Sequence, residues 1–453
     1  MTRAEVRAAA SLALVFFLRM LGLFMITPVF PLYAEHLDGA TPALVGLAVG
    51  VYGLTQALLQ IPFGMASDRL GRKKVITAGL LVFAGGSAVA ALSHHIAGVA
   101  IGRALQGAGA VGSATMALAA DLTREETRIK AMAIIGMTIG LAFPIAFVIG
   151  PSLGHWLGAA SVFWIAGALG LGAIAVLQAL VPQPAHSGFH RDVSLNLADL
   201  GSILRDHELV RIYVGAFALH MTLQALFLVL PLDLRDALGI DPAHHWHIYL
   251  PALALSIVLL GPLFRLSGQR GLMKEVYCGS VLAIAAASFA LGFAGNGVTP
   301  TVLLLALFFT GFNFLEASQP SLVSQRAPAA RRGTALGPYS AFQFLGISLG
   351  GAAGGWLHEH YGKTAVFVFC GAVCLGWLVY AIGMKPPRKL ANRMFQIGVM
   401  TVDAAEALAA RLRAIAGVLE ATVVPEDGIA YLKVDPARLD LAALEAVVQF
   451  ART

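Results

Sequence analysis

Residues 64–74 read GMASDRLGRKK, and they join two long apolar runs at residues 43–66 and 75–94. The two glycines of this stretch permit a tight turn and a close approach of the flanking segments. Asp68 lies at the edge of the first apolar run, where it offers a charge partner for the arginines or for a helix N-terminus. The stretch therefore predicts a charged turn between two apolar helices.

The composition extends this pattern to most of the chain. Charged residues make up 12% of the sequence and apolar residues 58%, with a mean hydropathy of +0.77. A soluble domain carries about twice that share of charge, whereas a helix that crosses a bilayer needs about 20 apolar residues. Such runs recur along the first 384 residues. The sequence therefore predicts an integral membrane protein embedded in lipid, with no indication of a nucleic-acid partner.

Apolar runs separated by polar breaks predict twelve membrane spans. They cover residues 11–33, 43–66, 75–94, 98–121, 131–154, 160–181, 212–231, 247–264, 275–296, 299–323, 333–357 and 364–384. Of the 31 basic residues, 22 lie before the first span or in alternate breaks, and only Arg235 and Lys363 lie on the opposite side. Because short cytoplasmic loops carry an excess of Lys and Arg, both termini are expected in the cytoplasm.

An internal repeat indicates two related halves. Residues 150–157, GPSLGHWL, recur as GGAAGGWL at residues 350–357, and a long polar segment separates the sixth span from the seventh. We therefore expect six-helix halves at residues 1–181 and 209–384, joined by a cytoplasmic linker at 182–208. Repeated halves with a binding site at their interface are a common plan of transporters.

Residues 64–74 resemble the signature loop of the major facilitator superfamily, Gly-x-x-x-Asp-Arg-x-Gly-Arg-Lys. The resemblance implies an all-α membrane fold of twelve helices in a pseudo-symmetric six-plus-six arrangement. It also implies a transporter of the bacterial inner membrane, not an enzyme, that works by alternating access.

In this family the cytoplasmic end of the fourth span packs beside the signature loop, so Asp121 is expected to pair with Arg69 or Arg72. Such a charge cluster can hold one conformation and release it when a charge is neutralised. The expected latch residues are Gly64, Asp68, Arg69, Gly71, Arg72, Lys73 and Asp121. The alternative is a basic loop with a helix cap and no mechanical role.

Two arginines lie inside expected spans. Residues 102–107, GRALQG, resemble the family's Arg-x-x-Gln-Gly motif, which is linked to proton coupling. An arginine at mid-depth costs about 2.5–3.5 kcal/mol on the insertion scale, so Arg103 and Arg19 should face a cavity or a partner. Gln56 and Gln60 share one face of the second span and are expected to line the cavity or to bond to Arg103. The alternative for both arginines is snorkelling to the interface.

Two titratable residues are candidates for proton coupling in the second half. Glu316 is the carboxylate that lies clearly inside an expected span, the tenth. An ionisable residue within a membrane span is a functional-site candidate by default. His220 in the seventh span can titrate near neutrality. A neutral, hydrogen-bonded structural role is the alternative for each.

The end of the fifth span partially matches the Gly-Pro-x-x-Gly-Gly motif of the family's antiporters. Gly150, Pro151 and Gly154 agree with the motif, but His155 replaces its last glycine. Helix bending and close packing explain the same residues structurally. The match favours exchange of two solutes across the membrane.

These features together favour a proton-coupled antiporter that exports a small drug-like or metabolite molecule. Its partners would be the substrate and protons, with the proton-motive force as energy source, and we expect no cofactor and no metal site. One alternative is an importer of an anion or metabolite attracted by Arg19 and Arg103. Another is a membrane sensor or scaffold that no longer transports and signals through its C-terminal tail.

The character of the sequence changes after a linker expected at residues 385–393. Residues 394–453 have the pattern strand, helix, strand, strand, helix, which predicts a small α+β ferredoxin-like domain in the cytoplasm. Asp403, three residues before an acid, is expected to cap the first helix. The tail resembles the heavy-metal-associated domain but has no Cys-x-x-Cys, so soft-metal binding by that route is excluded.

The tail and the membrane part differ in charge. Residues 394–453 have a net charge of −3 and residues 1–393 a net charge of +9. We therefore expect the tail to dock reversibly on the cytoplasmic loops. Since surface ion pairs are weak and screened by salt, this docking should weaken as ionic strength rises.

Overall fold

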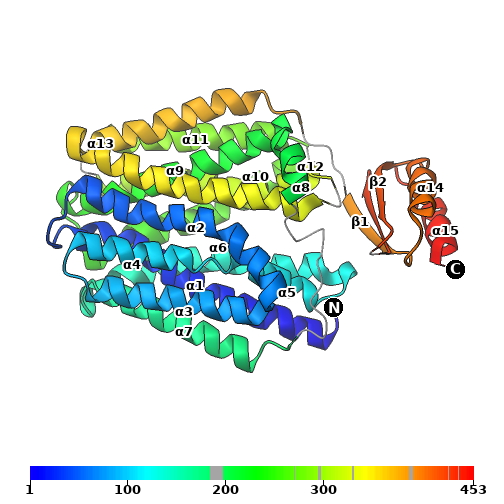
Figure 1. Ribbon diagram of the computed structural model, residues 1–453. Coiled ribbons are helices and arrows are strands. Elements are labelled where there is room, and N and C mark those ends of the chain that lie inside the picture. Colours follow the sequence, from blue (N-terminus) through cyan, green and yellow to red (C-terminus); the bar gives the residue numbers. More distant parts are fainter. Residues whose placement is uncertain are drawn as a thin grey trace.

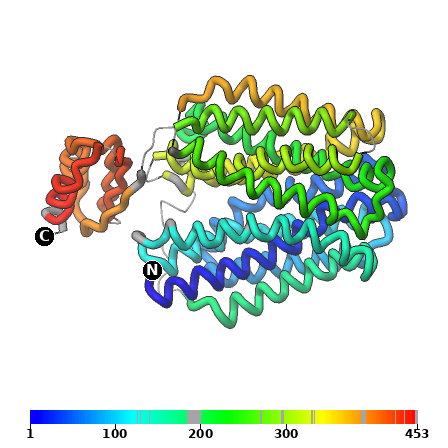
Figure 2. The backbone as a smooth tube through the Cα atoms, turned by 180° about the vertical axis from the view of Figure 1, so that it is seen from behind, coloured from blue at the N-terminus to red at the C-terminus, as the bar shows by residue number. Residues whose placement is uncertain are grey.

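The computed structural model describes residues 1–183, 197–269, 271–293, 297–328, 331–386, 391–426, 428–436 and 438–452. Residues 184–196 of the expected linker 182–208 and residues 387–390 of the expected linker 385–393 lie outside this range. The chain forms a helical bundle with a small α+β domain at one end, and both termini lie toward that end (Figures 1 and 2). We call it the cationic end, because the basic loops at residues 69–74 and 124–130 lie there too.

The bundle is built from long helices that run between the cationic end and the opposite end. Its helices are α1 (Arg3–Ala34), α2 (Pro42–Leu70), α3 (Arg72–Leu92), α4 (Ile96–Ala108), α5 (Gly112–Asp121), α6 (Glu125–Trp156), α7 (Ser161–Ala179), α8 (Leu197–Leu204), α9 (His207–Asp236), the 3₁₀ helix η1 (Pro242–His244), α10 (Trp246–Gln269), α11 (Met273–Phe293), α12 (Val298–Arg326) and α13 (Arg332–Ile382). Within the described residues, ten helices are long and apolar enough to cross a membrane.

Two features reconcile these ten helices with twelve expected spans. The fourth span is broken at Gly109 into α4 and α5, and each piece alone is too short to cross a bilayer. Helix α13 has 51 residues, a length of about 75 Å if straight, and it contains a non-helical residue at Gly362 (φ 81°, ψ 178°). Gly362 lies between the eleventh and twelfth expected spans. The helical architecture is therefore the expected one, and the short helix α8 in the linker is an addition that hydropathy did not predict.

The two halves meet most closely where α2 lies along α13 (Figure 1). A Cβ atom on Gly50 would lie 2.5 Å from the carbonyl oxygen of Ser348, and one on Gly351 would lie 2.6 Å from that of Gly46. Small residues allow this backbone contact between membrane helices. At the same end of the bundle, Arg235 of α9 pairs with Glu35 after α1 at 2.5 Å. Through these contacts the two halves touch each other at the end of the bundle that lies opposite the cationic end.

Replacing Gly50 with valine is expected to disfavour this closed arrangement. Overpacking costs about 1–3 kcal/mol, which corresponds to about a five- to 150-fold shift between two conformations. Spin labels at the exposed residues Leu44 and Trp356 should then report a longer distance across the opposite end. Gly85→Val is the matched control, because a Cβ atom there meets nothing within 4 Å. An unchanged label distance in Gly50→Val would contradict this account of the closure.

The tail contains a three-stranded antiparallel sheet with two helices. Its elements are β1 (Ala391–Gln396), α14 (Val402–Arg413), β2 (Val418–Val424), β3 (Ile429–Val434) and α15 (Leu441–Arg452), and the strand order is β1-β3-β2. This confirms the ferredoxin-like order of elements. Two details differ from expectation. The first strand begins at Ala391, inside the expected linker, and Thr401 caps α14 in place of Asp403, because Thr401 has the extended backbone that a cap needs (φ −70°, ψ 158°).

Candidate functional site

The turn between α2 and α3 places one arginine at the centre of a buried charge cluster. Gly71 ends α2 with φ 96°, and Arg72 begins α3. The Arg72 guanidinium donates to Asp121 Oδ2 at 3.1 Å and to Ser67 Oγ at 2.8 Å, and it also pairs with Asp68. The side chains of Arg72 and Asp121 are 2% and 0% exposed. Asp121 was expected to pair with Arg69 or Arg72, and its partner is Arg72. Arg69 is exposed.

Other expected latch residues lie around this cluster in the first half. Lys73 is buried, and its Nζ donates to the carbonyl oxygen of Val181 after α7 at 2.6 Å. Gly64 allows α2 to approach Ser113 of α5, whose Oγ would lie 3.0 Å from a Cβ atom on this glycine. The cluster therefore joins α2, α3, α5 and the end of α7.

An acid missed by the sequence analysis links α1 to the start of α6. Glu5 accepts hydrogen bonds from the backbone and side chain of Arg124, both at 3.0 Å, and from Thr127 Oγ1 at 2.9 Å. Glu5 is 5% exposed and also closes a capping box with Thr2. The Thr-x-x-Glu spacing was the signal in the sequence, but it indicated only a helix start.

Replacing Asp121 with asparagine is expected to slow transport without preventing membrane insertion. Removing one partner of a buried ion pair costs about 3–5 kcal/mol, so the α2–α3 turn should loosen. Asp68→Asn should have a smaller effect, because its side chain is 31% exposed. Transport rates at equal protein levels test this, with the exposed Lys74→Gln as a control for loop charge. Full activity of both aspartate variants would refute the latch.

Arg19 is buried in the first half without a carboxylate partner among the described residues. Its Nη2 donates to Gln56 Oε1 at 3.0 Å and to the carbonyl oxygen of Gly109 at 3.2 Å, at the break between α4 and α5. This carbonyl also accepts a hydrogen bond from the backbone N–H of Val111 at 3.0 Å. Gln56 in turn donates to Gln60 at 3.3 Å. Gln56 thus bonds to Arg19 of α1 and not to Arg103, and the other expected role of the two glutamines, lining the cavity, stays a prediction. The Nε and Nη1 atoms of Arg19 have no hydrogen-bond partner among the residues that the structure describes.

Arg103 lies in α4, before the same break at Gly109. Its Nη1 donates to Gln106 Oε1 at 2.8 Å, and its guanidinium carbon lies 4.7 Å from the ring centroid of Tyr52. Arg103 is 5% exposed and Arg19 is 1% exposed. Both side chains thus lie inside the bundle, which contradicts the alternative of snorkelling to the interface.

The structure brings Glu316 and His220 together in the second half. Glu316 Oε2 of α12 lies 3.4 Å from His220 Nε2 of α9. Gln343 of α13 lies between them, with its Nε2 3.3 Å from His220 Nε2 and 3.4 Å from Glu316 Oε1, and it also donates to Tyr339 at 3.2 Å. Gln343 was missed, because a single amide in an apolar span gives no pattern. Polar side chains from three helices therefore meet in one cluster within the membrane part.

Aromatic side chains beside this cluster connect the two halves. Phe143 of α6 lies 6.0 Å from Phe309 and 6.1 Å from Phe312 of α12, measured between ring centroids. The Phe312 ring lies 6.0 Å from that of His220. Aromatic pairs across the halves were not anticipated, since phenylalanines are common in every span.

The expected antiporter motif lies in α6 against α1. A Cβ atom on Gly150 would lie 2.9 Å from the carbonyl oxygen of Met25, and one on Gly154 would lie 3.0 Å from Val29 Cγ1. Pro151 is buried within the same helix. The motif therefore packs two helices of the first half together, and its role in exchange remains a prediction.

Comparisons with known proteins agree with this architecture. The family model described as "Major Facilitator Superfamily" matches residues 12–264 and 212–396. The "Inner membrane transport protein YajR" of Escherichia coli (strain K12) is 40% identical over 451 residues, which cover 100% of this chain and 99% of that protein. The "Multidrug resistance protein MdtH" of Klebsiella pneumoniae (strain 342) is 27% identical over 75% of this chain and 84% of its own length.

Solved structures show the same fold at low sequence identity. A bacterial homolog of the human lysosomal transporter Spinster, in an inward-facing and occupied conformation, has a TM-score of 0.70 and 14% identity, and the match covers 84% of this chain and 97% of that one. These relatives are membrane transporters and not enzymes. The chain is thus a multi-pass transporter of the inner membrane, and it belongs to the Major Facilitator Superfamily.

Proposed function

We propose that the chain is a proton-coupled antiporter that exports a small drug-like or metabolite molecule by alternating access. The observation that carries this proposal is the cluster of Glu316, His220 and Gln343, where a carboxylate and an imidazole lie 3.4 Å apart inside a membrane protein. Intramembrane carboxylates are costly and mark proton pathways in many transporters. The similarity to a multidrug resistance protein supports the choice of substrate class.

Protonation of this cluster can be coupled to conformation through its hydrogen bonds. An ionised Glu316 only accepts hydrogen bonds, whereas a protonated one also donates. A proton bound here would also remove the negative charge of Glu316, and charged side chains are costly within membrane helices. Because the cluster joins α9, α12 and α13 beside the aromatic contacts with α6, this change acts at the interface of the two halves.

The closed contacts at the opposite end support alternating access. The halves meet there through α2 and α13 and through the Arg235–Glu35 pair. At the cationic end, the described latch contacts of Arg72 and Lys73 stay within the first half. If the cationic end is cytoplasmic, as the distribution of basic residues predicts, this arrangement suits access from the cytoplasm.

A second candidate is import of an anion, favoured by a specific observation. Within the described part of the chain, the buried Nε and Nη1 of Arg19 and the buried Nε of Arg103 have no hydrogen-bond partner. No carboxylate of the described residues pairs with either arginine. Buried charges are normally paired. A carboxylate or phosphate on the substrate would therefore supply hydrogen-bond acceptors and negative charge to the guanidinium groups of Arg19 and Arg103.

The purified protein in proteoliposomes with an internal pH indicator separates these candidates. A panel of amphiphilic cations and organic anions is added outside, and proton movement is recorded. Antiport predicts that the substrate and protons move in opposite directions. Joint movement of an anion and protons would favour the importer, and an absence of proton and substrate flux across the panel would favour a sensor or scaffold.

A further inference from the structure

One lysine of the tail is buried against the membrane part. Lys433 lies on β3, the central strand of the tail sheet, and is 3% exposed. Its Nζ donates to the carbonyl oxygens of Arg326 at 3.1 Å and Ala327 at 3.0 Å, and lies 3.6 Å from Glu420 on β2. Lysine is almost never fully buried unless it is paired. Lys433 therefore has a specific binding partner in the bundle.

That partner is the end of α12. Arg326 is the last residue of this helix and Ala327 follows it as the C-cap. The last carbonyl groups of a helix have no partner within the helix, and a cation there is further favoured by the helix dipole. The Lys433 ammonium thus caps α12 from another domain.

The end of α12 is itself fixed to the second half. Arg326 Nη1 pairs at 3.1 Å with Glu208 in the first turn of α9. Glu208 also accepts a hydrogen bond from the backbone of Lys385 at 3.1 Å, and Arg211 donates to the carbonyl oxygen of Gly383 at 2.5 Å. These bonds join α12, α9 and the end of α13. A domain attached to α12 is therefore attached to the whole second half.

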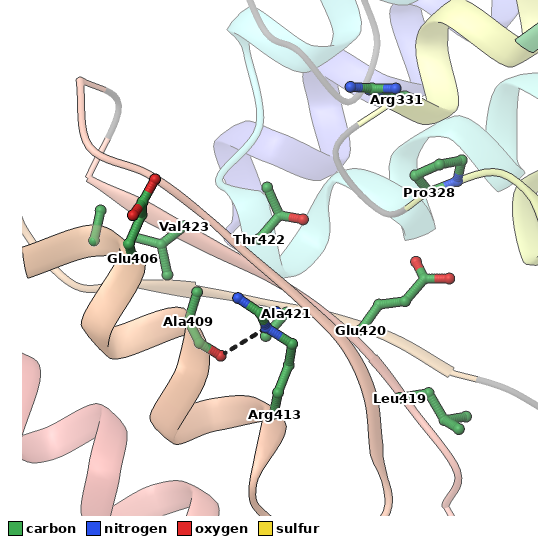
Figure 3. A pocket seen from close by; sticks show the side chains of 11 residues that line it. Pro328, Arg331, Glu406, Ala409, Arg413, Leu419, Glu420, Ala421, Thr422 and Val423 are labelled. Carbon is green, nitrogen blue, oxygen red and sulfur yellow. Dashed lines mark hydrogen bonds between the residues drawn. The ribbon is translucent and has the colours of Figure 1, made fainter. Parts of the chain in front are cut away.

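A cavity of about 530 Å³ lies beside this contact. Pro328 and Arg331, in the loop after α12, face Thr422 of β2 across it (Figure 3). The rest of its lining comes from α14 and β2 of the tail. Beside this open space, the Lys433 bonds are a buried attachment between the tail and the end of α12.

We infer that Lys433 fastens the tail to the cationic end of α12, so that the tail moves as part of the second half when the two halves rock. This attachment differs from the charge-driven docking expected from net charge, because a cation of the acidic tail binds neutral carbonyl groups. Buried contacts of this kind are screened much less by salt than surface pairs. The tail is thereby linked to the helix that carries Glu316.

Distances between spin labels in the full-length protein in lipid nanodiscs test this inference. One label replaces the exposed Val402 of the tail, and the other replaces the exposed Ser321 of α12, after replacement of Cys278, Cys370 and Cys374. We expect a narrow distance distribution that stays narrow between about 0.1 and 1 M salt. Lys433→Met should broaden it several-fold, whereas the matched control Arg438→Met, an exposed tail cation, should not.

A second label pair tests the shared movement. With Val402 and the exposed Lys74 of α3 labelled, the distance should change when Gly50→Val shifts the conformation, while the Val402–Ser321 distance stays the same. A Val402–Ser321 distribution that broadens with salt, or that Lys433→Met leaves narrow, would overturn the inference. Protease resistance shows whether Lys433→Met unfolds the tail. If it does, the salt series on the labelled protein that retains Lys433 tests the inference in its place.

Discussion

Replacing Glu316 with glutamine is expected to abolish proton-coupled flux while the protein still inserts and folds. Glutamine has the same shape and keeps an acceptor for Gln343 at 3.4 Å, but it cannot bind and release a proton. The Glu316 side chain is 33% exposed, so the effect comes from losing a group that can carry a proton and not from the burial of a charge. We expect more than about a tenfold loss of coupled flux, equivalent to about 1.4 kcal/mol. Substrate and proton fluxes in proteoliposomes across a pH series measure the effect.

The neighbouring residues provide the controls for this experiment. Glu275→Gln removes an exposed acid from the same half and should leave the flux unchanged. His220→Gln should alter the pH dependence, because the imidazole lies 3.4 Å from Glu316 Oε2. If Glu316→Gln retains the full pH dependence of flux, the proton acceptor lies elsewhere and His220 becomes the next candidate.

Replacing Arg103 with alanine is expected to impair transport more than replacing it with lysine. Alanine leaves Gln106 and the Tyr52 ring without the guanidinium that lies against both. A buried group left without a hydrogen bond costs about 1–3 kcal/mol, so we expect about a five- to hundredfold loss for Arg103→Ala. Lysine keeps the charge and the cation–π contact but loses the planar fork of donors, and its effect should be intermediate.

Transport rates of the two Arg103 variants at equal protein levels test this order. The exposed Arg7→Ala in α1 controls for the loss of a positive charge. Arg19→Ala tests whether the second buried arginine acts with Arg103 or only caps the break at Gly109. Equal activities of Arg103→Ala and Arg103→Lys would show that transport does not use the charge of this residue.

Much of the fold follows from local chemistry in the sequence. The length of apolar runs predicts membrane helices, because a helix needs about 20 residues to cross the hydrocarbon core. The turn at Gly71 and the order of helices and strands in the tail were likewise local signals. The break at Gly109 and the start of β1 at Ala391 differed from expectation, because hydropathy reports neither hydrogen bonds nor strand pairing.

The composition of the site depended on contacts between distant parts of the chain. A membrane helix is apolar on all sides, so periodicity did not show which face of α9, α12 or α13 points inward. Glu316 and His220 could be chosen singly because polar groups are costly in lipid, but their 3.4 Å separation depends on how three helices pack.

The same holds for Gln56, which bonds to Arg19, and for Lys433, which caps a helix about a hundred residues earlier. Residue type and local pattern were sufficient to predict helices, strands and candidate charges. The pairing of these charges was set by tertiary packing, because each buried polar group must find its partner wherever the folded chain brings one within hydrogen-bonding distance.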